Sequence, residues 1–205
     1  TMARIVVIGA GSLVFASRLT IDILSVPELA GSTLVYVDID PKALALIRSF
    51  AEQVIAQHKL PAQVITTTNR REALAGADYV ITTFRVGGAQ ATSADLRIPL
   101  KYGIDQSVGD TIGVGGIFYG QAHIRLMIEI CRDMEELCPD AWLLNHTNPM
   151  AMLCWAVNQA TGIKNVGLCH SVQHTSEQLA GHIGAPYAEV DYWVAGINHM
   201  AFYLT

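Results

Sequence analysis

The sequence has 205 residues, of which 51% are hydrophobic and 15% are charged, and its formal net charge is −5. A chain of this length buries enough apolar surface to fold without disulfides or structural metal ions, so any metal is expected to serve function. The Lys and Arg residues are scattered rather than clustered, which argues against a nucleic-acid partner because such a partner requires a basic surface.

The apolar runs and the cysteines limit the class of protein further. No apolar run approaches the roughly 18 residues of a membrane span, because Gly, Ser and charged residues interrupt each one. We therefore expect no membrane partner. The four cysteines form no C-x-x-C pair, so reduced thiols in a cytoplasmic protein are expected at Cys131, Cys138, Cys154 and Cys169.

Short β-branched runs alternate with longer helical patterns, which predicts βαβ units. Strands are expected over 4–8, 33–37, 63–67, 79–83, 141–144, 165–168 and 191–197. Helices are expected over 12–25, 42–58, 70–74, 118–137, 149–160 and 171–183. The glycine-rich stretch 85–117 is expected to be a long functional loop without regular structure.

This order of elements predicts an α/β fold with a doubly wound, mostly parallel sheet of the Rossmann type. We expect residues 1–195 to form the nucleotide-binding domain and residues 196–205 to begin a second, α+β substrate domain. The last residues are apolar and typical of a strand, so the chain is expected to be an N-terminal portion of a longer protein.

A glycine turn follows the first predicted strand and opens the first helix. Gly9 and Gly11 let the backbone turn tightly and approach a pyrophosphate, which the helix start at Ser12 would bind through free N–H groups. Val14 stands where a complete G-x-G-x-x-G fingerprint has its third glycine. The alternative is a glycine turn in an α/β protein that binds no nucleotide.

Two further residues are candidates for binding the same cofactor. Asp38 ends the second predicted strand, where a carboxylate accepts hydrogen bonds from the adenosine ribose. Its charge repels a 2′-phosphate, so NAD is favoured over NADP. Thr83, at the end of the predicted strand 79–83, is the other candidate.

Two loops carry a candidate polar residue each. Asn148 joins a predicted strand to a helix at the edge that faces the ligand crevice, so its amide could contact cofactor and substrate. The alternative is an ordinary helix N-cap. Asp110 lies among glycines and could assist proton transfer, although an Asx-type turn is equally typical of such a loop.

A thiol and two imidazoles follow the later predicted strands. Cys169 and His199 lie thirty positions apart, and a thiolate with an imidazole would suit Mn, Fe, Co, Ni or Zn. His170 follows Cys169 directly. The alternative for this pair is two buried structural residues. The other cysteines are expected in the core, and surface or packing roles are expected for His58, His123, His174 and His182.

As an ordered set, these segments resemble glycoside hydrolase family 4, the glycosidases that depend on NAD and a divalent metal. The matching segments are Gly9–Ser12, Asp38–Asp40, Val86–Gly88, Gly109–Gly116, Asn148–Met150, Cys169–Ser171 and Gly196–Met200. The Cys-His-Ser form resembles the α-galactosidases and α-glucosidases that act on unphosphorylated sugars, and the melibiase-type α-galactosidases are most similar. Thr92 stands where the phosphoglycosidases have an arginine for the sugar phosphate.

The resemblance implies a redox-assisted elimination. Bound NAD oxidises the sugar at C3, the metal, Mn²⁺ or another divalent ion, polarises the ketone, and a base removes the C2 proton before the leaving group departs. The resemblance assigns the metal to Cys169 and His199 and the substrate contact to Asn148. It also makes Asp110 the carboxylate that raises the basicity of the base, and His170 a candidate proton donor.

The resemblance further implies a small sugar as substrate and a homo-oligomer, either a dimer or a tetramer. It places the catalytic base beyond residue 205, so we expect this chain alone to be a poor or inactive glycosidase. Two other functions remain open. The first is an NAD-dependent dehydrogenase of the lactate/malate type, and the second is a nucleotide-binding module without catalytic function.

Overall fold

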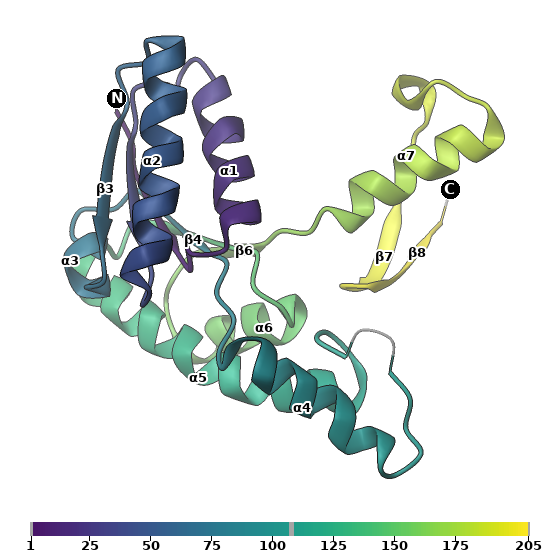
Figure 1. Ribbon diagram of the computed structural model, residues 1–205. Helices are drawn as coiled ribbons and strands as arrows, with labels where there is room; N and C mark the ends of the chain where they lie inside the picture. The colour runs from purple at the N-terminus through teal and green to yellow at the C-terminus, as the bar shows by residue number, and fades with distance from the viewer. Residues whose placement is uncertain (1, 107–108, 205) are drawn as a thin grey trace.

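The computed structural model describes residues 2–106 and 109–204 (Figure 1). Its centre is a six-stranded parallel sheet in the order β3-β2-β1-β4-β5-β6. The strands are β1 (Arg4–Ile8), β2 (Thr33–Val37), β3 (Gln63–Thr67), β4 (Tyr79–Thr82), β5 (Trp142–Asn145) and β6 (Asn165–Gly167). The order reverses between β1 and β4, so the predicted doubly wound Rossmann-type sheet is confirmed.

Helices cover both faces of this sheet. Helices α1 (Leu13–Ser25) and α2 (Pro41–His58) lie on one face, and α3 (Arg70–Leu74), α5 (Gly113–Leu137) and α6 (Met150–Ala160) lie on the other (Figure 1). Alternate residues of one strand reach opposite cores: Val6 and Ile8 pack toward α5, whereas Ile5 and Val7 pack toward α1 and α2. Burial on both faces explains why the strands read as continuous apolar runs.

The stretch from 85 to 117 differs from the prediction. It contains helix α4 (Gly88–Leu100) and the first turn of α5, so the expected long irregular loop was wrong. In α5, a Cβ at Gly115 would lie 2.7 Å from the Gly109 carbonyl oxygen, and one at Gly116 would lie 2.7 Å from the Thr111 carbonyl carbon. These glycines therefore let the loop around Asp110 pack directly on a helix start, and they do not prevent the helix.

The C-terminal elements leave the sheet. After β6 come α7 (Ser171–Ile183), the short 3-10 helix η1 (Tyr187–Glu189) and an antiparallel hairpin of β7 (Val194–Ile197) and β8 (Met200–Tyr203). Figure 1 shows α7 and the hairpin extending away from the sheet as an arm. The domain boundary predicted after residue 195 falls inside β7, and the division into two domains stays a prediction. Within the described residues, no helix is both long and apolar enough to cross a membrane.

Candidate functional site

A cavity of about 840 Å³ opens at the carboxyl ends of β1, β2, β4 and β5. In doubly wound sheets this edge, at the reversal of strand order, is where ligands bind. Six of the predicted site residues line it: Gly9, Ser12, Asp38, Thr83, Asp110 and Asn148. The structure thus brings the two glycine-rich loops of the sequence, around residues 9 and 110, to one cavity.

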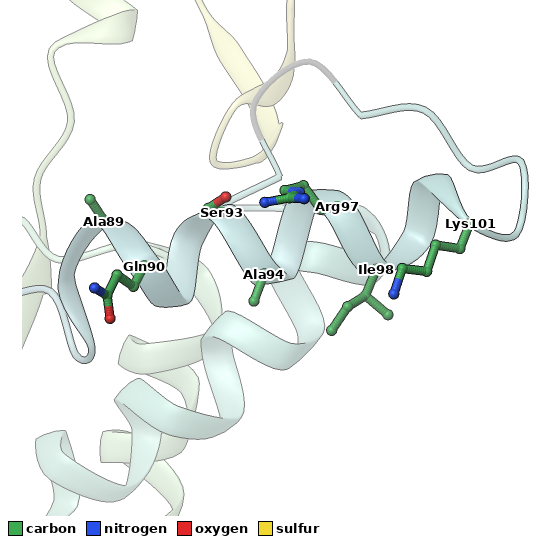
Figure 2. Close-up of a pocket in the computed structure, with 7 residues that line it drawn as sticks. All are labelled: Ala89, Gln90, Ser93, Ala94, Arg97, Ile98 and Lys101. Atoms are coloured by element: carbon green, nitrogen blue, oxygen red, sulfur yellow. The ribbon is translucent and has the colours of Figure 1, made fainter.

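A second pocket runs along α4 and contains none of the predicted site residues (Figure 2). Its lining is Ala89, Gln90, Ser93, Ala94, Arg97 and Ile98 of this helix and Lys101, which directly follows it. With a single element as its wall, it offers no convergent set of polar groups such as a ligand site requires. The cavity at the sheet edge is therefore the candidate site.

The glycine turn is shaped by close contact with the strand beside it. Gly9 has a φ of 91°, and a Cβ there would lie 2.6 Å from the Phe84 backbone nitrogen. The Thr83 hydroxyl donates to the Gly9 carbonyl at 3.1 Å, which fixes the turn against the end of β4. Val14, in place of a third glycine, is 67% exposed. Its side chain therefore points to solvent and needs no glycine to avoid a clash.

The Asp38 carboxylate is oriented by two backbone donors. Gly11 N–H donates to Oδ2 at 2.7 Å, and Asp40 N–H donates to Oδ1 at 3.0 Å. A Cβ at Gly11 would lie 2.6 Å from Oδ2, so this contact requires glycine. Each carboxylate oxygen can accept a second hydrogen bond, which leaves acceptors for ribose hydroxyls. Together with the free N–H groups at the start of α1, these residues fit a dinucleotide.

Cys169 and His199, thirty residues apart in sequence, come together. Cys169 Sγ lies 3.3 Å from His199 Nε2. Metal bonds of about 2.3 Å to sulfur and about 2.1 Å to nitrogen put two adjacent ligands roughly 3.1 to 3.6 Å apart. The pair therefore fits the two donors that a divalent ion would need. Among the described residues, no group of three or more His, Cys, Asp or Glu side chains gathers as a metal site, so most ligand positions would belong to water or substrate.

Thr111 orients the imidazole ring of His199 by contacting Nδ1, the nitrogen that faces away from Cys169. Its hydroxyl donates to Asp110 Oδ1 at 2.9 Å and lies 2.8 Å from His199 Nδ1. Because a hydroxyl has one proton, which Thr111 gives to Asp110, His199 Nδ1 is the donor to the Thr111 oxygen, and in the neutral tautomer Nε2 is the acceptor nitrogen. A partner on the second ring nitrogen is what orients imidazole ligands of metals. Sequence reasoning missed Thr111, although it adjoins Asp110.

Asp110 and Asn148 contact each other inside the cavity. Asn148 Nδ2 donates to Asp110 Oδ2 at 3.4 Å, and Arg85 Nη2 lies 3.8 Å from the same oxygen. Pro149, not Asn148, precedes α6, so the N-cap alternative for Asn148 was wrong. Asp110 contacts three side chains, with its own side chain only 13% exposed. This places a carboxylate beside the Cys169–His199 pair.

An aromatic cluster surrounds His170. Its ring centroid lies 5.9 Å from that of His146 and 6.1 Å from that of Phe15, and both of these residues line the cavity. The ring centroid of His174 also lies 5.9 Å from that of His170. Burial lowers the pKa of His146, and the nearby His170 lowers it further. Sequence reasoning missed His146, and its place directly after β5 was the available signal.

His123 holds the loop between β4 and α4. It is fully buried, its Nδ1 donates to the Tyr119 carbonyl at 2.7 Å, and its Nε2 accepts from Val86 N–H at 2.9 Å. Burial lowers the pKa of His123, in agreement with this neutral tautomer. The predicted packing role is confirmed.

Comparison with known proteins identifies the family. Residues 4–185 match the family model described as Family 4 glycosyl hydrolase. The chain is 47% identical over 202 residues to an α-galactosidase of Rhizobium meliloti, covering 98% of this chain and 41% of the relative. It is 41% identical over 204 residues to an α-galactosidase of Bacillus subtilis, covering 99% and 47%. The chain thus spans less than half the length of these relatives.

A solved structure shares the fold. The 6-phospho-β-glucosidase from Thermotoga maritima, determined with manganese, NAD⁺ and glucose-6-phosphate, superposes with a TM-score of 0.84 and 26% identity. The match covers 98% of this chain and 48% of that one.

Proposed function

The chain belongs to glycosyl hydrolase family 4, and from this membership we propose that it is the NAD- and metal-binding part of a glycosidase. The convergence of Cys169 and His199 beside the cavity that contains Asp38 carries the proposal. A lactate/malate-type dehydrogenase has no need of a thiolate–imidazole pair at this place. A module that only binds nucleotide has no need of Asp110 and Asn148 next to that pair.

The chain's own residues would divide the work along the cavity. Asp38 and the Gly9–Ser12 turn would hold the dinucleotide, with Thr83 supporting the turn. Cys169 and His199 would hold Mn²⁺ or another divalent ion. When bound, NAD supplies a hydride acceptor for a sugar carbon, and the metal supplies a Lewis acid for the oxygen on it. This chemistry would permit cleavage of the glycosidic bond by elimination of the leaving group.

Three polar side chains would face the sugar between cofactor and metal. Asn148 would donate to a sugar hydroxyl, since its amide lines the cavity next to the Asp110 carboxylate. Asp110 would support the base that removes the proton from the neighbouring carbon, because a carboxylate stabilises a cationic or protonated partner. His170, whose ring is near those of the cavity residues Phe15 and His146, is proposed as proton donor.

We propose an unphosphorylated sugar, with α-galactosides favoured. The α-galactosidase relatives support this choice. The contacts of Arg85 also support an unphosphorylated sugar. Its Nη1 donates to the Thr92 hydroxyl at 3.1 Å, and its Nη2 lies near the Asp110 carboxylate. Arg85 is thereby occupied within the chain and offers little to a sugar phosphate.

Calorimetric titration in the presence of NAD and Mn²⁺ tests the sugar class. Galactose should bind more tightly than glucose, and both more tightly than glucose-6-phosphate. Preference for the phosphorylated sugar would contradict the proposed substrate class.

We also propose a cytoplasmic homo-oligomer, dimer or tetramer. Support comes from an apolar surface on α5 and α6, where Trp155 is 70% exposed and Ile117 is 50% exposed. Light scattering on the chain would show a dimer or larger mass, and a monomer at all concentrations would contradict this.

A further inference from the structure

One end of the cavity is built from residues that follow β2 and β3 and from the face of α5. These lining residues are Asp38, Ile39, Thr68, Arg70, Leu126 and Ile130. In dinucleotide-binding sheets the adenosine lies beyond the second strand, with an acidic residue at its ribose. Arg70 is therefore the cation that faces the adenosine end, whereas Arg85 lies beside Asp110.

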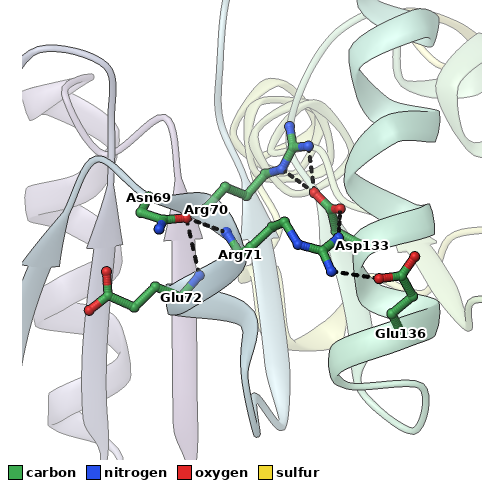
Figure 3. Close-up of polar contacts among 6 residues, drawn as sticks. All are labelled: Asn69, Arg70, Arg71, Glu72, Asp133 and Glu136. Atoms are coloured by element: carbon green, nitrogen blue, oxygen red, sulfur yellow. Dashed lines mark hydrogen bonds and ion pairs between the residues drawn. The ribbon is translucent and has the colours of Figure 1, made fainter.

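Arg70 is already paired within the protein (Figure 3). Its Nε donates to Asp133 Oδ2 at 2.7 Å, and its Nη2 lies 2.5 Å from the same oxygen. Arg71 binds the other oxygen of Asp133 and reaches Glu136 Oε2 at 2.5 Å. Two guanidinium groups thus face two carboxylates, and the four charges balance.

The burial of the four side chains is unequal. The Asp133 side chain is 12% exposed and that of Arg70 is 28% exposed, whereas Arg71 and Glu136 are at least half exposed. The outer pair, Arg71 with Glu136, joins α3 to α5 at the surface. Of the inner pair, Arg70 lines the cavity, and Asp133 neutralises the charge that Arg70 would present to a ligand there.

We infer that Asp133 helps to select NAD over NADP by pairing Arg70 and so withholding the guanidinium charge from the 2′ position of the adenosine ribose. In NADP-binding proteins an arginine near this place binds the 2′-phosphate, often by donating two parallel hydrogen bonds. Here Asp38 repels the phosphate and Asp133 removes the cation that would attract it. The inference rests on the proposed function, since it assumes that the cavity binds a dinucleotide.

Asp133→Asn tests the inference by removing the charge with little change of shape. Arg71 retains Glu136, while Arg70 loses its anionic partner and can turn to the cavity. The dissociation constants of NAD and NADP are measured by calorimetry on the 205-residue chain. We expect affinity for NADP relative to NAD to rise about tenfold, the effect of one charge-assisted pair of hydrogen bonds.

Two variants make the test specific. Glu136→Gln breaks the outer pair only, so its NADP to NAD ratio should equal that of the unchanged chain. Asp133→Asn combined with Arg70→Gln should lose the gain, because the freed guanidinium is absent. A ratio that is unchanged in a folded Asp133→Asn, as judged by circular dichroism, would overturn the inference.

Arg70→Gln alone tests the same wall if Asp133→Asn does not fold. Because Asp133 already withholds this guanidinium from the ribose, the ratio of NADP to NAD affinity in this variant should equal that of the unchanged chain. A fall in relative NADP affinity would show that the paired guanidinium still serves the 2′ position, which would overturn the inference and leave the proposed function standing. Absence of NAD binding by the unchanged chain would instead overturn the proposed function, and the inference with it.

Discussion

His199 joins three parts of the sequence at a single side chain. It lies in the two-residue turn of the β7–β8 hairpin, and its φ of 62° is unusual for a residue with a Cβ. One ring nitrogen meets Thr111 and the other meets Cys169. Such a conformation is retained where surrounding contacts fix it, and it is common at functional sites.

Thr111→Val should therefore weaken metal binding without unfolding the chain. Valine keeps the shape but cannot accept from His199 Nδ1, so the ring loses the partner that orients it. Mn²⁺ affinity should fall by about 10-fold or more, the range found for partners of metal ligands. Calorimetric Mn²⁺ titration measures this, with Thr66→Val on β3 as a matched control. Equal affinities in all three chains would show that Thr111 does not orient the ligand.

At the scale of elements, the start of α5 carries the loop that holds Asp110 and Thr111. The helix begins with Gly113, and the buried Gly115 and Gly116 lie directly under the backbone of that loop. Glycine inside a helix costs about 1 kcal/mol of stability relative to alanine. At these two positions, close packing of the loop against the helix offsets that cost. The position of the loop therefore depends on the absence of Cβ atoms below it.

Gly116→Ala should displace the loop, because its Cβ would lie 2.7 Å from backbone atoms of Thr111. We expect unfolding free energy to fall by about 1 to 3 kcal/mol, as for other overpacked positions, and Mn²⁺ affinity to fall as well. Gly181→Ala on α7 is the control, since nothing lies within 4 Å of its Cβ. That variant should gain about 0.5 to 1 kcal/mol in urea unfolding. Loss of stability in both variants would remove the packing argument.

Much of the fold followed from the sequence because strands buried on both faces leave a local signal. The strands from residue 4 to residue 67 lie where the apolar runs predicted them. Helix α4 was missed because its inner surface is sparse: Pro99 is its one buried residue among those described. The glycines around it also suggested a loop, although they serve close packing.

The candidate site was predicted in part. Residues at the ends of β1, β2, β4 and β5 could be placed at one edge, since parallel strands end together. The contact of Cys169 with His199 did not follow from that rule, because His199 lies in the turn of the antiparallel β7–β8 hairpin. Thr111, His146 and the Arg70–Asp133 pair were not foreseen, because their contacts join residues far apart in the sequence and leave no periodic signal. Their roles arise from three-dimensional packing alone.

At the scale of the whole molecule, stability is linked to pH through buried imidazoles. Burial lowers the pKa of His123 and of His146 in the folded chain. The unfolded chain therefore binds more protons just below the ordinary histidine pKa of about 6.5. Stability rises with pH wherever the unfolded state binds more protons, so it should be lost as pH falls through this range.

His123→Leu should reduce this pH dependence. The variant loses the contact with Val86 N–H, so it is expected to be less stable at every pH, by about 1 to 3 kcal/mol. Its unfolding free energy should nevertheless change less between pH 7.5 and 5.5 than that of the unchanged chain. Urea unfolding at several pH values measures both effects. His58→Gln, at an exposed histidine, controls for loss of an imidazole as such, and an unchanged slope in His123→Leu would contradict the assignment.

Side-by-side binding of NAD and a divalent metal at one site underlies the proposed function. It can be tested by calorimetric NAD titration, with and without Mn²⁺ and galactose, on the unchanged chain and on Cys169→Ala. We predict that both chains bind NAD, and that only the unchanged chain binds galactose in a Mn²⁺-dependent manner. NAD binding with no effect of metal or sugar in either chain would contradict the claim and leave a dinucleotide-binding domain.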